Sequence, residues 1–423
     1  MTAPLPWLAP HRDTPFVGEV LVPGSKSLTN RVLILAALGD GPSVITRPLA
    51  SRDTNLMAAA LTALGATIQR DGMTWTVTPP KSVGTEPATV DCGLAGTVMR
   101  FVPLLAGFGR APVTFDGDEH ARVRPMGTTI ATLRSLGVEV DDGGRSSLPF
   151  TVQGTGRISG GRVDVDASAS SQFVSALLLA GAAYAEGVTV QHVGPPVPSL
   201  PHIEMTLACL REHGVVVHAT ADTWTVEPSP IGATDVVIEP DLSNAAPFLM
   251  LAMTSGGRVR VPGWPASTTQ PGDELRHLLA SMGAEVTLDD EGLTLRGTGR
   301  IEGLDADLHD VGELAPALAG LCAVASSPSR LRGIAHIRGH ETDRLTALAV
   351  ELKGLGAGVQ EHHDGLTIVP APMHGGEFKT YADHRMAHAA VIVGSAVDGV
   401  LVENVATTAK TFPGFAEVWA GLF

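Results

Sequence analysis

The chain has 423 residues, of which 44% are hydrophobic and 4% aromatic, and its formal net charge is -15. This length allows two or three domains with well-filled cores, whereas so acidic a molecule repels nucleic acid and anionic membranes at long range, which argues against both as partners. No apolar run reaches about 18 residues and the first residues lack the order of a signal peptide, so we expect a cytoplasmic protein.

The stretch 23–31 (PGSKSLTNR) predicts a turn that leads into a buried helix, because residues 32–38 (VLILAAL) are all apolar. Lys26 and Arg31 then lie near a helix N-terminus, which already carries partial positive charge. Cations gathered there favour a bound anion. A serine-capped helix with a solvated lysine is the alternative that this stretch alone leaves open.

One pattern recurs five times: a helix that ends at glycine, followed by alternating apolar and polar residues. It predicts a helix, a glycine stop and a strand hairpin. The five glycines are Gly65, Gly137, Gly214, Gly283 and Gly356.

A second pattern, an apolar helix of small residues followed by a turn and a strand, recurs at a spacing of roughly 70 residues, which indicates repeated supersecondary units. Its six copies cover residues 33–45, 104–115, 177–190, 248–261, 318–331 and 389–402. Helices this apolar must be buried on every side, so we expect them to lie inside the sheets.

We therefore predict an α/β fold of six βαβαββ units arranged as two inside-out α/β barrels of three units each. The predicted domains are residues 23–240, and residues 1–22 with 241–423. The first strand, 17–22, is assigned to the C-terminal half because the last unit has no leading strand of its own. The three scattered cysteines, Cys92, Cys209 and Cys322, are expected to be reduced core thiols.

Unusual polar residues lie mostly where the buried helices are expected to begin, or in nearby turns. If these helix ends face one cleft, their dipoles converge there. Six cations belong to this set, too many for one phosphate and suited to a pair of anionic substrates: Lys26, Arg31, Arg124, Arg344, Arg385 and Lys410.

Each of these signals has a simpler explanation when taken alone. Residues 168–173 (SASSQF) could be a capped helix start, residues 341–344 (ETDR) a surface ion pair, and Glu313 a first-turn acid. His384 and His388 have the helical spacing of metal ligands, but Arg385 between them disfavours a cation, so no metal is expected. No phosphate-binding loop or dinucleotide motif is present either.

In order along the chain, PGSKSLTNR, GLAGTVMR, RVRPMG, SASSQF, HETDRL, YADHRMAH and AKTFPG resemble the motifs of the 5-enolpyruvylshikimate-3-phosphate (EPSP) synthase family. The resemblance covers nearly the whole chain. It implies two domains of three units each with the active site in the cleft between them, closure on substrate binding, no cofactor, and transfer of the enolpyruvyl group of phosphoenolpyruvate to shikimate 3-phosphate.

The resemblance also implies site residues. Those expected against shikimate 3-phosphate are Lys26, Ser27, Arg31, Ser170, Ser171, Gln172, Ser199, Glu313 and His340. Those expected against phosphoenolpyruvate are Lys26, Gly96, Arg124, Gln172, Arg344, Arg385 and Lys410, with His384 close by. Glu313 and Glu341 are the candidates for proton transfer, with Lys26 as acid partner and charge stabiliser and His384 as a further catalytic candidate.

Several positions depart from the pattern common in that family. Leu94, Glu313, His202, His336, His340 and Phe101 stand where many members have Asn, Asp, Tyr, Asn, Lys and Pro. Glu313 keeps the carboxylate, whereas an unperturbed histidine at position 340 is mostly neutral at pH 7.

Two other functions fit the sequence less well. The UDP-N-acetylglucosamine enolpyruvyl transferases carry a cysteine in the loop before their RP motif, and residues 117–125 (GDEHARVRP) contain none. A non-catalytic clamp around DNA would need a basic inner stripe, and the buried helices are apolar. We expect a monomer, since such a two-domain enzyme must open and close.

Overall fold

The computed structural model describes residues 5–423, which divide into two compact units. One unit is the continuous segment 24–238, and the other joins the residues up to 23 with 239–423. The domains predicted from sequence differ from these units by one residue at the first crossover and two at the second. No helix among the described residues is both long and apolar enough to cross a membrane.

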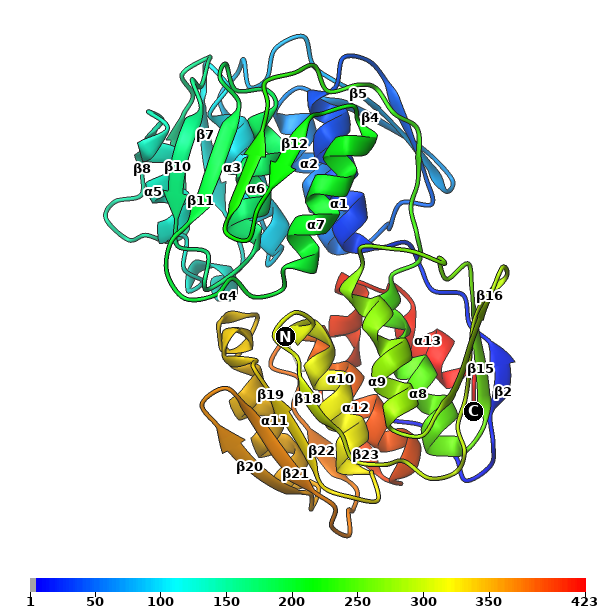
Figure 1. The fold of residues 1–423 in the computed structure, drawn as a ribbon. Helices are drawn as coiled ribbons and strands as arrows, with labels where there is room; N and C mark the ends of the chain where they lie inside the picture. Colours follow the sequence, from blue (N-terminus) through cyan, green and yellow to red (C-terminus); the bar gives the residue numbers. More distant parts are fainter. Residues whose placement is uncertain (1–4) are drawn as a thin grey trace. The chain divides into compact units, whose positions relative to one another are not determined.

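Unit 24–238, blue to green in Figure 1, places three helices inside three separate four-stranded sheets. The inner helices are α1 (Lys26–Leu38), α3 (Gly96–Ala106) and α6 (Gln172–Gly181); α2 (Arg52–Ala63), α5 (Gly127–Ser135), α7 (Pro201–Glu212) and the short α4 (Glu119–Arg122) accompany them. The sheet orders are β14-β3-β5-β4 (Val236–Val237, Ser43–Thr46, Thr74–Thr78, Thr67–Asp71), β6-β7-β9-β8 (Ala88–Asp91, Pro112–Asp116, Phe150–Gln153, Glu139–Asp141) and β10-β11-β13-β12 (Gly161–Val165, Val188–His192, Thr223–Val226, Val217–Ala219).

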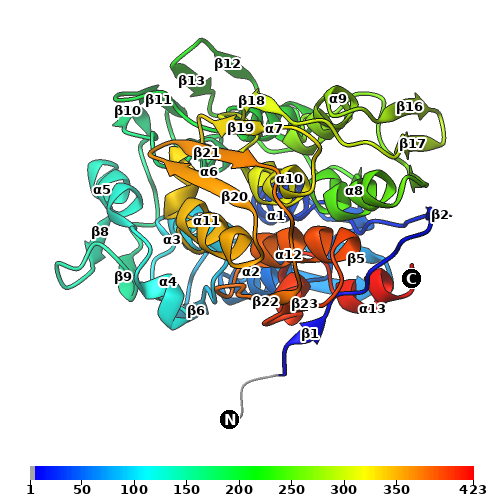
Figure 2. The same ribbon diagram turned by 90° about the horizontal axis from the view of Figure 1, so that it is seen from below.

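The other unit repeats this plan. Its inner helices are α8 (Ala246–Ser255), α10 (Ala315–Ala323) and α12 (His384–Ala396), with α10 packed beside α12 in both Figure 1 and Figure 2. The other helices are α9 (Leu275–Ser281), α11 (Arg344–Gly354) and α13 (Phe415–Ala420). Its sheets are β16-β17-β15-β2 (Glu285–Asp289, Gly292–Arg296, Arg258–Pro262, Val17–Glu19), β18-β19-β21-β20 (Asp305–Asp307, Ser329–Arg332, Gly365–Val369, Gly358–His362) and β1-β23-β22 (Trp7–Leu8, Val400–Val402, Gly376–Phe378).

The pairing of the first two strands differs from the expectation, and so does the composition of the last repeat. Strand β2 lies with the C-terminal residues, but it pairs in parallel with β15 of the fourth repeat, and the last repeat is completed by β1 instead. That last repeat is a three-stranded sheet without a hairpin, so the sixth βαβαββ unit is incomplete. The six sheets also remain separate and do not close into a barrel among residues 5–423.

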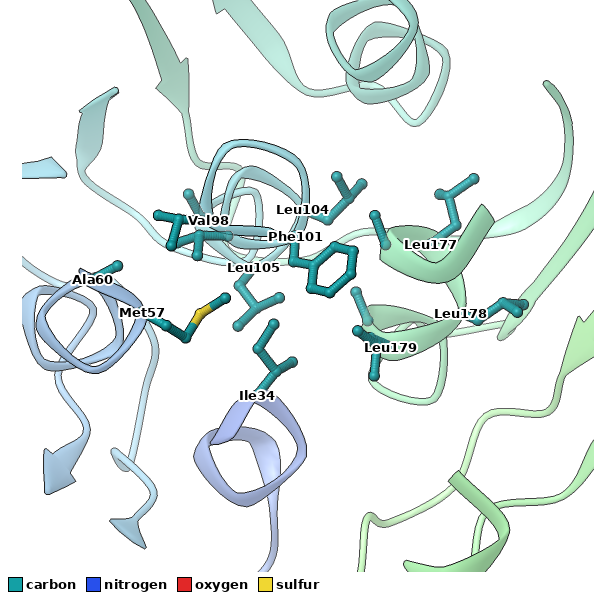
Figure 3. Close-up of a cluster of buried hydrophobic side chains, with 14 of the residues drawn as sticks. Ile34, Met57, Ala60, Val98, Phe101, Leu104, Leu105, Leu177, Leu178 and Leu179 are labelled. Carbon is teal, nitrogen blue, oxygen red and sulfur yellow. The ribbon is translucent and has the colours of Figure 1, made fainter. Parts of the chain in front are cut away.

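Each unit has its own hydrophobic core, built on the inner helices. Figure 3 shows the core of unit 24–238, where Phe101 on α3 faces leucines of α6 and lies near Ile34 on α1. Phe101 is fully buried, and burying a ring of that size contributes about 1.5–3 kcal/mol. The inner helices are thus buried on all sides, as their apolar composition predicted.

The five predicted glycine stops all adopt the left-handed conformation, with φ of +104°, +80°, +77°, +99° and +98° at Gly65, Gly137, Gly214, Gly283 and Gly356. In each, the amide after the glycine donates to the carbonyl of the leucine five residues back, at 3.0 Å. This geometry satisfies carbonyls that a helix end leaves unpaired and turns the chain into the following hairpin.

Candidate active site

Helix α1 begins at Lys26, and Ser25 before it accepts a hydrogen bond from the Leu28 amide at 3.4 Å. The serine cap therefore exists, but Lys26 is not a solvated lysine. Its side chain is 20% exposed, and Nζ lies 3.3 Å from Oδ2 of Asp53, a carboxylate that is 3% exposed in the first turn of α2. The ammonium of Lys26 is thus oriented by a buried carboxylate.

Arg31 is buried and holds helices together. Its guanidinium donates to Thr206 Oγ1 at 2.8 Å, to the His202 carbonyl at 2.9 Å and to the Ser27 carbonyl at 3.0 Å. Burial lowers the pKa of Arg31 to about 10. Position 202 contributes its backbone oxygen, so the change from the common tyrosine to histidine does not affect this contact.

Two guanidinium groups gather at the start of α3. A Cβ on Gly96 would lie 3.2 Å from both Arg100 Nη1 and Arg124 Nη2, tighter than ordinary contact, so glycine lets both arginines approach the helix end. Arg124 is 8% exposed and donates to the Leu94 carbonyl at 3.3 Å, while Arg100 donates to Gln172 Oε1 at 2.7 Å. Positive charge at a helix N-terminus is unfavourable unless an anion is bound.

The serines lie at the starts of α6 and α7. Ser171 precedes α6 without a side-chain cap, and Ser170 Oγ accepts from the Gln172 amide at 3.3 Å instead. Ser199 has a φ of +56°, a backbone conformation that costs a non-glycine residue of order 1–3 kcal/mol. Such strain is found most often where a side chain is positioned for function.

In the other unit, Arg344 is the centre of a buried ionic network. Its Nε donates to Asp383 Oδ2 at 2.7 Å and its Nη2 to Glu341 Oε2 at 2.8 Å, and Glu341 Oε1 accepts from Lys410 Nζ at 2.5 Å. The side chains of Arg344, Glu341 and Lys410 are only 3%, 11% and 10% exposed. The interpretation of residues 341–344 as a surface ion pair is therefore wrong.

Asp383 also caps α12. Its Oδ1 accepts from the Arg385 amide at 2.8 Å, and Arg385 Nη1 donates to the Ser243 carbonyl at 3.0 Å. Ser243 Oγ in turn lies 3.4 Å from Glu313 Oε1. Burial lowers the pKa of Arg385, against the opposing effect of the carboxylates of Asp241 and Glu313.

The two histidines of α12 are packed edge to face, 6.0 Å apart. His384 is 3% exposed, with Nδ1 3.7 Å from Asp383 Oδ1, and His388 is fully buried. No three His, Cys, Asp or Glu side chains within residues 5–423 are grouped so as to hold a metal ion.

A family profile described as EPSP synthase (3-phosphoshikimate 1-carboxyvinyltransferase) matches residues 11–419. The chain belongs to the EPSP synthase family. It is 54% identical, over 98% of its own length and 96% of the relative's, to a 3-phosphoshikimate 1-carboxyvinyltransferase of Kocuria rhizophila.

Solved structures of lower identity share the fold of this EPSP synthase family member. An EPSP synthase of Acinetobacter baumannii is 24% identical and superposes with a TM-score of 0.80 over 97% of both chains. The enolpyruvyl transferase NikO of Streptomyces tendae is 19% identical, with a TM-score of 0.74 over 97% of this chain and 96% of that one. These similarities confirm the predicted two-domain α/β fold.

The residues expected from the EPSP synthase motifs fall into two groups, one in each unit. Unit 24–238 carries Lys26, Ser27, Arg31, Gly96, Arg124, Ser170, Ser171, Gln172 and Ser199; the other unit carries Glu313, His340, Glu341, Arg344, His384, Arg385 and Lys410. Lys26, Gly96, Gln172 and His384 begin inner helices, whereas Arg344 begins α11 and Ser199 lies in the turn before α7, neither of which is an inner helix.

Sequence reasoning missed Asp53 as the partner of Lys26, and no local pattern marks it. It also missed Ser243, which lies in the short 3-10 helix Leu242–Ala245 before α8. A signal was available there, because residues 241–244 (DLSN) repeat the polar helix starts of the other repeats. The predicted domain boundary at residues 240–241 does not by itself indicate a functional role for this segment.

Proposed function

We propose that the chain transfers the enolpyruvyl group of phosphoenolpyruvate to the 5-hydroxyl of shikimate 3-phosphate and releases phosphate. The observation that carries this proposal is the match to the EPSP synthase family over residues 11–419, together with the 54% identity to a curated 3-phosphoshikimate 1-carboxyvinyltransferase. The sequence motifs behind that match are the residues gathered in the two groups described above.

We assign the two anionic substrates to these groups by their chemistry. Phosphate and carboxylate oxygens are bound best by forked arginine donors and helix N-terminal amides, which Gly96, Arg124, Arg344 and Arg385 supply. Sugar hydroxyls need serine, glutamine and carboxylate partners, and Ser170, Ser171, Gln172 and Glu313 are of these types.

The reaction requires three proton transfers, the formation of one C–O bond at C2 and the breaking of another. The 5-hydroxyl oxygen attacks C2 of phosphoenolpyruvate as it loses its proton, and C3 gains a proton to become a methyl group. The resulting tetrahedral intermediate then loses phosphate from C2 and one methyl proton, which restores the double bond. We assign the proton transfers to Glu313 and Glu341, and charge stabilisation to Lys26 and Lys410.

A phosphate-release assay tests the proposal directly. We expect release only when both phosphoenolpyruvate and shikimate 3-phosphate are present, and we expect it to persist in EDTA because no metal is assigned to the reaction. Turnover with UDP-N-acetylglucosamine in place of shikimate 3-phosphate, or loss of activity on chelation, would contradict it.

We further propose that the protein is cytoplasmic and monomeric. Size-exclusion chromatography with light scattering checks the oligomeric state.

A further inference from the structure

His192 is the last residue of β11, and its register partner Val165 is the last residue of β10. The two strands are parallel, so their carboxyl ends lie at the same edge of the sheet. Beyond this edge the chain follows two paths. Residues 166–171, the α6 segment, lead into α6, and residues 193–200, the α7 segment, lead into α7. Both segments carry serines that we assigned to shikimate 3-phosphate, and they separate at His192.

The imidazole of His192 contacts both segments, and the residue is only 7% exposed. Its Nε2 lies 2.7 Å from the Pro195 carbonyl oxygen. A carbonyl can only accept, so Nε2 carries the proton. Nδ1 lies 3.3 Å from the amide nitrogen of Ala167 and 3.2 Å from the Val165 carbonyl oxygen. In the neutral ring Nδ1 has a free lone pair and accepts from the Ala167 amide, so one side chain bonds the backbone of both segments.

Within the α6 segment, hydrogen bonds connect Ala167 to the serines. The Ala167 carbonyl accepts from the Ser170 amide at 3.0 Å. Ser170 Oγ accepts from the amide of Gln172, the first residue of α6, at 3.3 Å. Ser171 lies between these two residues and precedes the helix. A displacement of Ala167 would therefore move the turn that carries both serines.

The α7 segment contains three prolines, Pro195, Pro196 and Pro198. Proline has no backbone N–H, so this segment has few amides with which to fix its own conformation. The bond from the His192 ring to the Pro195 carbonyl holds the segment from outside. Further along the segment, Ser199 has the strained φ of +56° described above, a conformation that persists only where the surrounding structure holds it.

The two segments also lie against each other. A Cβ on Gly194 would be 3.0 Å from both Cγ and Oδ1 of Asp166, which is tighter than ordinary contact. Oδ1 of Asp166 accepts from the Ser168 amide at 2.9 Å, so this carboxylate is itself fixed within the α6 segment. At so close an approach, a ring bonded to both segments determines how far apart they lie.

We propose that His192 is a positioning residue, whose ring fixes the α6 segment relative to the α7 segment and so places Ser170 and Ser171 relative to Ser199. The consequence for shikimate 3-phosphate rests on the proposed function, whereas the connection between the two segments does not. His192 acts through these segments, and the groups assigned to proton transfer lie elsewhere. Loss of its hydrogen bonds should therefore weaken binding of that substrate and leave the chemical step nearly unchanged.

Amide hydrogen exchange measured by NMR tests the connection between the segments. We expect the Ala167 amide to be protected in the wild type, and His192→Leu to speed its exchange about tenfold. In His192→Asn the side-chain oxygen takes the place of Nδ1 as acceptor, so most of the protection should remain. Equal exchange of Ala167 in the wild type and in His192→Leu would overturn the proposal, whatever reaction the enzyme catalyses.

The phosphate-release assay tests the effect on substrate binding. His192→Leu should raise the KM for shikimate 3-phosphate about tenfold, with kcat and the KM for phosphoenolpyruvate within about threefold of the wild type. His192→Asn keeps the bond to Ala167 and His192→Gln the bond to Pro195, so each should raise that KM only about threefold. These two variants carry the test if His192→Leu does not fold. An unchanged KM for shikimate 3-phosphate in the variants that fold, or a fall in kcat alone, would contradict the proposal.

His213 provides the matched control, because it is a buried histidine of the same unit that bonds a backbone carbonyl away from both segments. It follows the end of α7, is 1% exposed, and its Nδ1 lies 2.7 Å from the Cys209 carbonyl oxygen. His213→Leu should lower stability and leave both KM values unchanged. If it raises the KM for shikimate 3-phosphate as much as His192→Leu does, general destabilisation explains both effects and the positioning role is wrong.

The two proposals fail in different ways. If the wild type releases no phosphate from the two substrates, the proposed function is wrong, and the consequence for shikimate 3-phosphate is wrong with it. The exchange of the Ala167 amide still decides whether His192 holds the two segments together.

Discussion

Glu341 accepts hydrogen bonds from two buried cations, Arg344 and Lys410, while Asp383 holds the other side of Arg344. Buried charges are stabilised mainly by their ion-pair partners. Removing one member of such a pair lowers the free energy of unfolding by about 3–5 kcal/mol, because the remaining charge is left uncompensated. Substitutions that keep the shape and the hydrogen bonds are therefore the informative probes of chemistry at the residue scale.

Glu341→Gln should lower kcat by about 100-fold or more, because Gln cannot accept or deliver the proton assigned to this carboxylate. The KM for phosphoenolpyruvate should change much less, since the amide oxygen can still accept from one of the two cations. Glu361→Gln is the matched control: Glu361 pairs with Arg338 at 2.7 Å on the same unit and has no assigned role. Normal turnover in Glu341→Gln would remove this residue from the mechanism.

Asp53→Asn should reduce kcat/KM about tenfold, because Lys26 would keep a hydrogen-bond partner but lose the negative charge that orients its ammonium. Steady-state kinetics with either substrate varied checks this. The adjacent residue supplies the control, since Arg52 makes a surface ion pair with Asp118, with side chains 53% and 37% exposed. Arg52→Gln is expected to change the free energy of unfolding by about 0.5 kcal/mol or less and to leave kinetics unaltered.

At the scale of elements, one feature recurs: α2, α5, α7, α9 and α11 are each followed, two residues after the helix ends, by a glycine in the left-handed conformation and then by a hairpin. The conformation, and not lack of space, requires glycine at Gly137 and Gly214, since a Cβ there would meet no atom within 4 Å. The repeated helix–hairpin structure therefore requires a residue that can adopt positive φ at one position in each copy, although the copies otherwise differ in sequence.

Gly137→Ala should lower the free energy of unfolding by about 1–2 kcal/mol, the cost of the left-handed conformation for a residue with a Cβ. Urea unfolding followed by circular dichroism measures it. Gly354→Ala is the opposite case, because Gly354 ends α11 within the helix and a Cβ there also meets nothing within 4 Å. That variant should be more stable by about 0.5–1 kcal/mol, and destabilisation by both would contradict the conformational explanation.

Local patterns predicted the inner helices, the glycine stops and the position of Lys26 at a helix start, because these depend on residues close in the chain. They failed where pairing is non-local. Strands β1 and β2 are too short to carry a pattern that selects β23 and β15 as partners. The partner of Lys26 was likewise hidden, since Asp53 becomes its neighbour only when α1 packs against α2.

At the scale of the whole molecule, buried histidines make stability depend on pH. Burial lowers the pKa of His213, His336 and His388 below the usual 6.5, to about 4 for His336. Below about pH 6.5, these histidines therefore bind more protons in the unfolded chain than in the folded chain. Their contribution to stability is fully present above about pH 6.5 and is lost as the pH falls towards the folded-state pKa.

We expect the free energy of unfolding to fall between pH 7 and pH 5 by up to ~1.4 kcal/mol per pH unit for each of these histidines. His388→Met should reduce this slope. It should also stabilise the protein by about 1–3 kcal/mol at pH 7, because neither ring nitrogen of the fully buried His388 has a hydrogen-bond partner among the described residues. Urea unfolding at several pH values measures both effects, with exposed His374→Gln as control. An unchanged slope in His388→Met would contradict the assignment.

The pairing of β1 with β23 has a consequence for biosynthesis. Residues 7–8 pair with residues 401–402, so the ribosome must add almost 400 residues after the first strand before its partner exists. At translation rates of about 5–20 residues per second, that is a wait of roughly 20–80 s. Unit 24–238 is continuous and has all its strand partners within itself, so it can fold during this interval. Strand β1 is made before this unit but can pair only after the unit is complete.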